Sequence, residues 1–423
     1  MKSKQSLFRK DFILVVIGQI ISLFGNNILR FALPLYLLNQ TGSSALFGVI
    51  SAAAFIPMIV LCPIGGLIAD RVNKKNVMVI LDFSTAATTV LFSIGLGKLD
   101  IVPLMAAFVI VLFGIMGTYQ PAVQASIPLL LDQENVMQGN AIVNMVNSLA
   151  GLIGPVIGGA VYSFVGLRPI LYISVVCFTF SAIMEIFIRI PVVKQQQQGS
   201  LFEVAKSDLK ESMHFICKQK PIVLKVAVIV SVFTLIVSSL VFIGIPVIVT
   251  QQLGFDEDLA NRLYGYMQGV SAVGSLLGGL FATVFAKKIK LRNVYVFMVI
   301  ASVGVLPMGL ATYFLTGMSS YIVFLVANVV IMITTALFQI QLMSAIQVVT
   351  PEHLLGKVIS CTVFIGMCAT PIGQIVYGAL FENLSDFPYI LFWAAGIIAT
   401  IISLATKKSF LDIEKEVERC KQA

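Results

Sequence analysis

The sequence predicts an all-α membrane protein with twelve transmembrane helices in two pseudo-symmetric six-helix bundles. Of its 423 residues, 58% are hydrophobic and only 11% are charged, and the mean hydropathy is +0.98. Soluble domains carry about 25% charged residues, so this chain has too little charge to cover a water-facing surface. A helix needs about 20 mostly apolar residues to cross the hydrocarbon of a bilayer. Such runs occur at 12–37, 45–69, 76–97, 101–124, 138–164, 168–190, 221–250, 262–286, 291–315, 320–347, 356–382 and 387–406.

The distribution of basic residues supports the same number of spans. With the N-terminus in the cytoplasm, 24 of the 28 Lys and Arg residues fall in cytoplasmic segments. The outer turns hold only Lys98, Arg168 and Arg262, and Arg30 lies inside the first span. This is the positive-inside bias, and an odd number of helices would break it in the second half. We therefore expect both termini in the cytoplasm, and the net charge of +8 requires no nucleic-acid partner.

A polar stretch at 191–220, with an amphipathic helix suited to the membrane surface, divides the chain. It separates an N-terminal bundle at 1–190 from a C-terminal bundle at 221–406, which a cytoplasmic tail at 407–423 follows. The halves resemble each other: GGLIADRVNKK from Gly65 matches GGLFATVFAKK from Gly278, an offset of 213. Gly154-Pro155 in the fifth span matches Thr370-Pro371 in the eleventh, an offset of 216. Such internal repeats are typical of transporters that alternate access around a central site.

The loop after the second span resembles the G-x-x-x-D-R-x-G-R-[RK] motif of the major facilitator superfamily. The resemblance extends over the whole chain and implies the major facilitator fold. It also implies that the motif is a gating latch, in which the Asp contacts the start of the eleventh span, near Gly356. Asn73 stands where the family has its second Gly, and Thr283 replaces the Asp in the second copy. The alternative is that the cations only enforce topology. The latch residues are Gly66, Asp70, Arg71, Lys74 and Lys75.

The fifth span carries G-x-x-G-P-x-x-G-G, which resembles the antiporter motif of drug-exporting facilitators. Its small residues continue the face of Asn140, Asn144 and Asn147 at helical spacing. The resemblance implies export as the direction of transport, whereas close helix packing is the simpler alternative. The motif comprises Gly151, Gly154, Pro155, Gly158 and Gly159.

Segments near 38–43 and 118–130 resemble the macrolide-efflux and enterobactin-exporter-like branch of that superfamily. Polar residues inside a membrane are costly, so we consider those in the spans as candidates for a substrate cavity. For each amide alone, a hydrogen bond between helices is an equal alternative, and Arg30 can equally be a structural or snorkelling residue. The candidates are Asn26, Asn27, Arg30, Gln120, Gln124, Asn144, Asn147, Gln268 and Gln374.

Carboxylates are scarce within the spans. Asp82 lies in the first turns of the third span and Glu185 near the inner end of the sixth. A proton-coupled exporter needs a titratable group there, so both are candidates for proton coupling. The alternatives are that Asp82 belongs to the cytoplasmic charge cluster beside Asp70 and that Glu185 pairs with Arg189, four residues on.

These observations predict a secondary exporter of a small, largely apolar compound, such as a drug, a macrolide or a siderophore, with proton antiport. An uptake carrier or a lysolipid transporter of the same fold is the alternative, and a receptor-like scaffold or channel is the alternative from another class. We expect no enzyme, cofactor or metal, because His214 and His353 lie in cytoplasmic segments, the six cysteines are scattered and no P-loop occurs. The expected partners are substrate, protons and membrane lipids, for a monomer in the cytoplasmic membrane of a bacterium.

Overall fold

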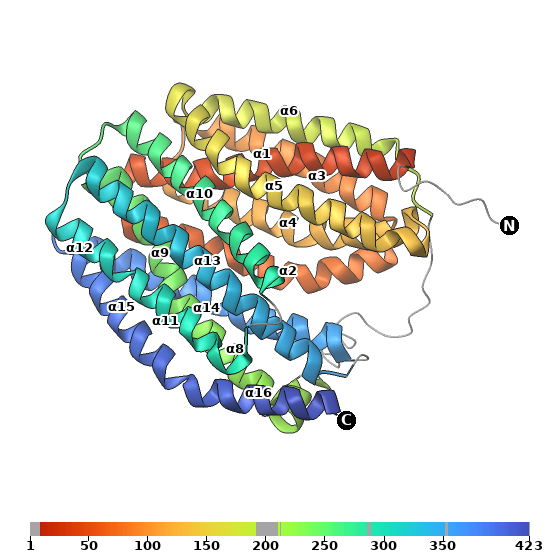
Figure 1. Cartoon of the computed structure of the whole chain (residues 1–423). Helices are drawn as coiled ribbons and strands as arrows, with labels where there is room; N and C mark the ends of the chain where they lie inside the picture. The colour runs from red at the N-terminus through yellow and green to blue at the C-terminus, as the bar shows by residue number, and fades with distance from the viewer. Residues whose placement is uncertain (1–8, 192–209, 212, 286–288, 352–353, 423) are drawn as a thin grey trace. The chain divides into compact units, whose positions relative to one another are not determined.

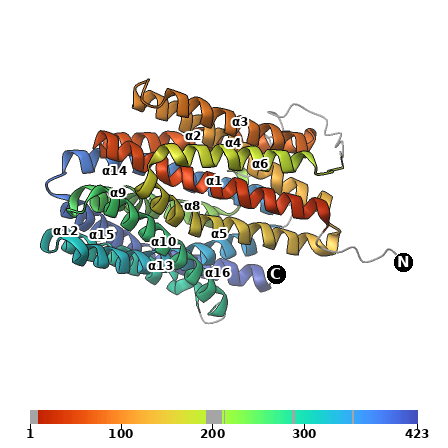
Figure 2. The ribbon, with the colours of Figure 1, turned by 90° about the horizontal axis from the view of Figure 1, so that it is seen from above.

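The computed structural model confirms the predicted number of spanning helices. It describes all residues except 1–8, 192–209, 212, 286–288, 352–353 and 423, and within helices it leaves out the side chains of 62–71, 134, 421 and 422. In this described part, twelve helices are long and apolar enough to cross a membrane. Most of the predicted amphipathic linker helix lies outside the described residues. The ribbon in Figures 1 and 2 follows the helices in chain order.

The first six spans are each one continuous helix. Gly42 and Gly166 have φ values of +65° and +75°, and they make the short turns after the first and fifth helices. Asn73 has an extended backbone and caps α3, because its side chain accepts a hydrogen bond from the Lys75 amide. The helices are α1 Lys10–Thr41, α2 Ser44–Arg71, α3 Lys74–Gly95, α4 Ile101–Leu130, α5 Gln133–Val165 and α6 Leu167–Ile186.

The seventh and ninth spans are interrupted. The seventh contains two π-helical turns, one of which follows Pro246, and the ninth changes helix beside Pro307. The second half consists of η1 Phe215–Gln219, α8 Pro221–Phe233, η2 Thr234–Ser238, α9 Ser239–Val247, η3 Ile248–Gln252, α10 Glu257–Val284, η4 Leu291–Asn293, α11 Val294–Gly304, α12 Leu306–Phe314, α13 Gly317–Val349, α14 Leu355–Asn383, α15 Pro388–Ala405 and α16 Lys407–Gln422.

The chain divides into two compact units, and each contains one short piece of the opposite half. Unit 1 comprises 1–41, 53–201 and 261–266, and unit 2 comprises 42–52, 202–260 and 267–423. In unit 1, α6 packs against both α1 and α3 (Figure 2). The inner faces of α1, α3 and α6 therefore share one core.

Unit 2 is held together largely by aromatic and glycine contacts. Phe392 on α15 lies edge-on to Phe324 on α13 and to Phe381 on α14. Trp393, the only tryptophan of the chain, packs on Tyr389 and against Gly309, where a Cβ atom would lie 2.6 Å from the indole. The core of this unit is therefore apolar and closely packed.

The predicted tail forms an amphipathic helix, α16, with a buried apolar face. Phe410, Ile413 and Val417 are each at most 3% exposed. Their spacing of three and four residues places them on one side of the helix. The sequence analysis did not assign this helix, which is too short and too charged for a span.

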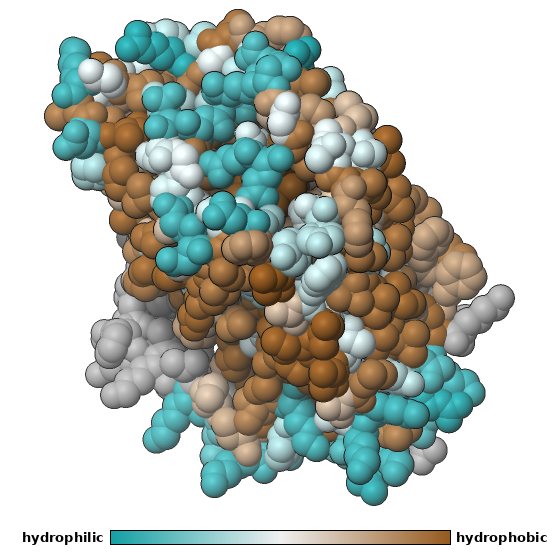
Figure 3. Space-filling view, turned by 90° about the vertical axis from the view of Figure 1, so that its left-hand side faces the viewer, coloured by the Kyte–Doolittle hydropathy of each residue, from teal (hydrophilic) through white to brown (hydrophobic). Residues whose placement is uncertain are grey.

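The surface agrees with a membrane protein. Many large aliphatic side chains of the spans are exposed, Ile80, Leu91 and Val176 among them. In the space-filling view, hydrophobic side chains cover much of the face, and hydrophilic ones gather toward its upper and lower ends (Figure 3). Lipid is the solvent that such a surface requires.

Candidate functional site

Two carboxylates are buried in unit 1, among α1, α3, α4 and α6. Glu185 on α6 is fully buried, and its Oε1 accepts a 2.7 Å hydrogen bond from the Tyr119 hydroxyl on α4. That hydroxyl in turn accepts a 2.8 Å bond from Nε2 of Gln19 on α1, which is also fully buried. The tyrosine thus links a carboxylate on one helix to an amide on another.

Asp82 is the second buried carboxylate and is 3% exposed. Its Oδ1 accepts a 3.0 Å hydrogen bond from the Ser22 hydroxyl on α1. It lies close enough to Glu185 for the two groups to interact electrostatically. We name Gln19, Ser22, Asp82, Tyr119 and Glu185 the carboxylate cluster.

Small residues allow this cluster to form. Gly18 on α1 faces Ser181, and a Cβ atom there would lie 3.4 Å from the serine Oγ and 3.7 Å from Cγ of Glu185. Ser181 is completely buried, and its hydroxyl donates a 3.1 Å hydrogen bond to the Gly18 carbonyl oxygen. The contact brings α6 close enough to α1 for the side chains of both helices to share one buried network.

One oxygen of each carboxylate has no hydrogen-bond partner among the described residues, namely Asp82 Oδ2 and Glu185 Oε2. A cavity with room for about one water molecule lies beside the cluster, lined by Asp82, Tyr119, Asn26 and Gln120 among others. No Lys or Arg forms an ion pair with either carboxylate in the part of the chain that the structure describes. A negative charge here would therefore be poorly compensated.

The structure separates Asp82 and Glu185 from the other roles weighed for them. The side chain of Glu185 contacts Tyr119, and no ion pair with Arg189 occurs among the described side chains. The backbone amide of Arg189 instead donates to Asp11. Asp82 is turned into the core toward Ser22 rather than exposed at the surface. Sequence spacing along α6 could not reveal these partners, because they come from other helices.

The other polar candidates in unit 1 do not form one cluster. Arg30 has its guanidinium 4.9 Å from the centre of the Phe113 ring, and Asn26 Oδ1 is buried without a partner among the described residues. Asn27 and Asn147 donate to backbone carbonyls of their own helices. Of the remaining side chains, Gln120 is half-buried, and Gln124 and Asn144 are exposed.

The candidates in unit 2 differ from each other. Gln268 on α10 is half-buried. Gln374 on α14 is fully buried, and both polar atoms of its amide have no partner within the described residues. An unsatisfied buried amide is costly, so Gln374 is the stronger candidate for a residue that gains a partner in another state or with a ligand.

The glycines of the fifth-span motif pack α5 against neighbouring helices. A Cβ at Gly154 would lie 2.6 Å from Cβ of Asn27 on α1, and one at Gly159 would lie 2.7 Å from Cα of Gly265 on α10. Gly158 faces Phe31, whereas Gly151 has nothing within 4 Å. Pro155 lies inside the helix. The motif thus contains glycines that closely contact another helix and one that does not.

The latch motif is only partly described. Gly66, Asp70 and Arg71 lie in the last turns of α2, and their side chains are outside the described set. Lys74 begins α3 and is 8% exposed, and Lys75 is half-buried. The proposed contact of Asp70 with the start of α14 therefore remains a prediction.

A further carboxylate, which the sequence analysis did not select, contacts the start of α2. Glu382, near the end of α14, accepts hydrogen bonds of 3.2 Å from both the Ser44 hydroxyl and the Ala45 amide. The two helices touch there through backbone, since a Cβ at Gly48 would lie 3.0 Å from Cα of Gly378. A carboxylate at a helix N-terminus is favoured by the exposed amides and the helix dipole. Because Glu382 ends an apolar span, its sequence position suggested only a turn.

Twelve helices that can cross a membrane, with ionisable side chains buried inside unit 1, define a helical membrane protein. A model of the Major Facilitator Superfamily matches residues 15–367. The chain belongs to the Major Facilitator Superfamily, as the sequence analysis inferred. It is a multi-pass transporter of a bacterial cell membrane.

Relatives and solved structures extend over nearly the whole chain. Macrolide efflux protein A of Streptococcus pyogenes is 25% identical over 392 residues, which cover 90% of this chain and 91% of that protein. Multidrug efflux pump Tap of Mycolicibacterium fortuitum is 22% identical over 416 residues, covering 96% and 95%. The crystal structure of a POT family transporter in complex with 5-aminolevulinic acid matches with a TM-score of 0.75 over 97% of this chain and 98% of that one, at 13% identity. At that identity the structural likeness bears on the fold alone.

Proposed function

We propose that this protein is a secondary exporter of small, largely apolar compounds that works by alternating access and exchanges its substrate for protons. The observation that carries the coupling part is the carboxylate cluster. Asp82 and Glu185 are buried together, and each has an oxygen without a hydrogen-bond partner among the described residues. Two carboxylates that interact at close range titrate as a pair, so the cluster can gain and release one proton.

Tyr119 gives the cluster a mechanism for that exchange. Its hydroxyl donates to Glu185 and accepts from Gln19, so a change of protonation at Glu185 alters a bond to α4 and, through it, one to α1. A protonated Glu185 can itself donate, which would reorder these bonds. Proton binding is thereby coupled to the contact among three helices of unit 1.

Two observations support export as the direction of transport: the glycine-proline motif of the fifth span, and the similarity of the chain to efflux proteins. An apolar drug-like or macrolide substrate follows from the same relatives and from the apolar lining of the spans. Arg30, which faces Phe113, is the group that would favour an acceptor-rich or anionic substrate such as a siderophore. We place the N- and C-termini in the cytoplasm on the charge bias, and we propose a monomer.

Alternating access requires contacts that form in one state and break in another. Two contacts could form such a pair. One is the observed contact of Glu382 with the start of α2, and the other is the predicted contact of Asp70 with the start of α14. Each carboxylate lies near the end of one of these two helices; Glu382 contacts the beginning of α2, and Asp70 would contact the beginning of α14 in the same way. We propose that the two caps alternate, so that only one is made at a time.

An accumulation assay tests the function. Cells with and without the protein are loaded with a panel of macrolides, dyes and catecholate siderophores, with and without an uncoupler. Lower accumulation of at least one compound in expressing cells, abolished by the uncoupler and by Glu185→Gln, is the expected result. Equal accumulation of every compound in both strains would contradict export, and higher accumulation in expressing cells would identify an uptake carrier.

A further inference from the structure

A pocket on unit 1 lies away from the carboxylate cluster, between the end of α3 and the beginning of α6. Its volume is about 440 Å³. Its polar rim contains Lys98 and Arg168, and its walls are mostly aliphatic. The lining comprises Val90, Ser93, Ile94, Leu96, Lys98, Arg168, Tyr172, Val175 and Val176.

The two cations of the rim come from segments that contact each other. Lys98 sits in a tight turn, in which its amide donates to the Gly95 carbonyl, and Gly97 has φ +82°. A Cβ at Gly97 would lie 3.5 Å from Nη2 of Arg168. The guanidinium of Arg168 therefore lies against the same turn that carries Lys98.

No acidic residue lines the pocket, and neither cation forms an ion pair with another described side chain. Asp100, two residues beyond Lys98, is exposed at the start of α4 and does not belong to the lining. Two neighbouring positive charges repel each other, and a bound anion relieves this repulsion. The rim is therefore suited to a phosphate group.

The topology rule does not account for these cations. Lys98 and Arg168 are two of only three Lys or Arg residues in the turns assigned to the outer side. Basic residues on that side oppose the positive-inside bias, yet the fold brings two of the three into one pocket. This concentration indicates a role other than orientation.

The walls below the rim are suited to an acyl chain. Ile94 and Val176 are 55% and 66% exposed, on the two helices that flank the pocket. Val176 follows Arg168 by eight residues, which is about 12 Å along a helix and comparable with one leaflet of a hydrocarbon core about 30 Å thick. Tyr172 lies between the charged and the aliphatic parts, where tyrosine is enriched at membrane interfaces.

We propose that this pocket binds one anionic glycerophospholipid, with the phosphate between Lys98 and Arg168 and an acyl chain along the aliphatic wall of α3 and α6. Such a lipid matches both parts of the pocket, since its phosphate carries the charge opposite to the rim and its acyl chain is apolar like the walls. The site is independent of the transport function proposed above, because it shares none of its lining with the carboxylate cluster.

The test is native mass spectrometry of the full chain from nanodiscs that contain equal amounts of phosphatidylglycerol and phosphatidylcholine. Wild-type protein should prefer phosphatidylglycerol over phosphatidylcholine by up to about 25-fold, since each of the two cations favours an anionic lipid by roughly fivefold. The double variant Lys98→Gln/Arg168→Gln should lose the preference. Arg262→Gln, which removes the third outer cation, is the matched control and should keep it; its guanidinium lies over Phe164, away from the pocket.

Two further arms separate the possible ligands. Val176→Gln leaves both cations in place and should lower lipid retention, because it places a polar group in the aliphatic wall. Excess inorganic phosphate should not displace the lipid. Equal retention of both lipids by wild-type protein, or a preference that survives in the double variant, overturns the proposal. Displacement by phosphate alone would show a free-anion site and also overturns it.

Discussion

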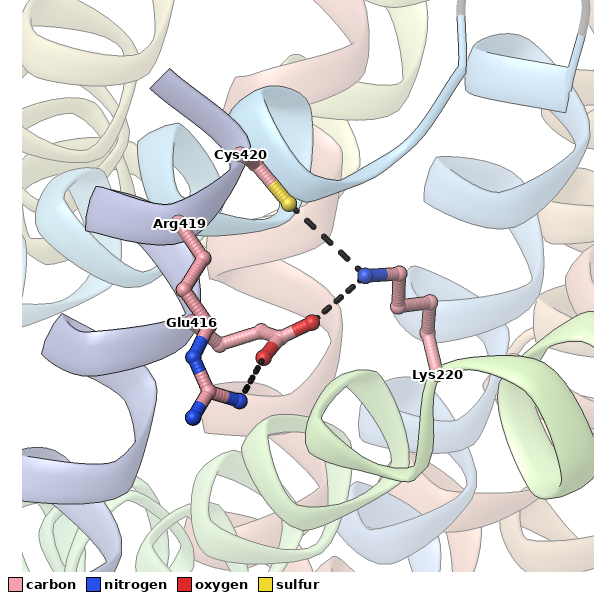
Figure 4. A network of polar contacts seen from close by, with 4 residues as sticks. All are labelled: Lys220, Glu416, Arg419 and Cys420. Carbon is pink, nitrogen blue, oxygen red and sulfur yellow. Dashed lines mark hydrogen bonds and ion pairs between the residues drawn. The ribbon is translucent and has the colours of Figure 1, made fainter. Parts of the chain in front are cut away.

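The two halves of the chain share a fold but differ in where they place their charges. The first six spans bury Asp82, Glu185 and Lys74, whereas no Asp, Glu, Lys or Arg is buried in the described part of the second half. The second half instead carries its ion pairs at the ends of its helices. Lys220 pairs with Glu416 and Lys225 with Asp412, which joins α8 to α16 (Figure 4 shows the first pair). Among the described residues, buried carboxylates therefore belong to the first half alone.

The largest expected effect breaks this asymmetry directly. Glu185→Gln and Asp82→Asn remove the titratable groups of the first half and should reduce proton-driven export by more than about tenfold, because hydrogen bonds to charged groups contribute about 1.5–3 kcal/mol each. Tyr119→Phe should have a smaller effect. The measurement is dye efflux into an imposed proton gradient in proteoliposomes.

Asp386→Asn is the matched control, since Asp386 is an exposed carboxylate of the second half. It should leave efflux unchanged. If Asp386→Asn slows efflux as much as Glu185→Gln does, the coupling is not confined to the first half.

The next prediction separates a packing role from a motif role on α5. Gly154→Ala should slow transport severalfold, because its new Cβ would lie 2.6 Å from Asn27 Cβ and overpacking costs about 1–3 kcal/mol. Gly151→Ala should be neutral, because nothing lies within 4 Å. Rates and expression levels of both variants in cells give the measurement. Equal loss in both variants would mean that the motif acts by something other than contact with α1.

A third prediction concerns the caps at the two ends of α2 and α14. Glu382→Gln weakens the bonds to Ser44 and Ala45 and should expose the start of α2. Labelling of a cysteine introduced at Ala45, with the native cysteines replaced, should then be faster by about fivefold to tenfold, which corresponds to about 1–1.4 kcal/mol. Asp70→Asn should slow export and change the labelling in the opposite direction. Changes of the same sign would exclude alternating caps.

The smallest expected effect concerns the ion pair between α8 and α16. The hydrogen bond between the two side chains raises the pKa of Lys220 and lowers the pKa of Glu416. The ion pair therefore stabilises the fold at a pH that lies above the pKa of Glu416 and below the pKa of Lys220. Its contribution is lost on acidification, as the pH falls through the lowered pKa of Glu416, and on strong alkalinisation, as it rises through the raised pKa of Lys220.

Because both groups are partly exposed, Glu416→Gln should destabilise the docking of α16 by only about 0.2–1 kcal/mol at neutral pH. Hydrogen exchange of α16 in detergent measures this effect, and the difference from wild type should vanish at low pH. Glu418→Gln is the matched control, since Glu418 is exposed on the same helix and forms no ion pair with a described side chain. A difference that persists unchanged in acid would rule out the ion pair as its cause.

The sequence was sufficient for the twelve spans, because hydropathy and helix length are local properties of the chain. It also selected Asp82 and Glu185, since charge inside an apolar run is visible without a structure. Their partners could not be predicted, because Ser22, Gln19 and Tyr119 come from other helices and their meeting depends on helix rotation. Glu382 was missed for the opposite reason: at the end of a span a carboxylate is ordinary, and only the fold brings it to the first amides of α2.

The docking of α16 was missed because its apolar residues are few and widely spaced among charges. Phe410, Ile413 and Val417 fall on one face only after the segment is taken as a helix. A tail rich in Lys and Glu offers no hydropathy signal for such a short element.

Trp393 makes the second half spectroscopically distinct. It is the chain's sole tryptophan, and its ring meets that of Tyr389 edge to face while its indole lies against Gly309 on α12. Intrinsic fluorescence excited at the indole band therefore arises from this single position, with no contribution from unit 1. A change in its emission on addition of substrate or acid would show, without any label, that binding or protonation alters the packing between α12 and α15.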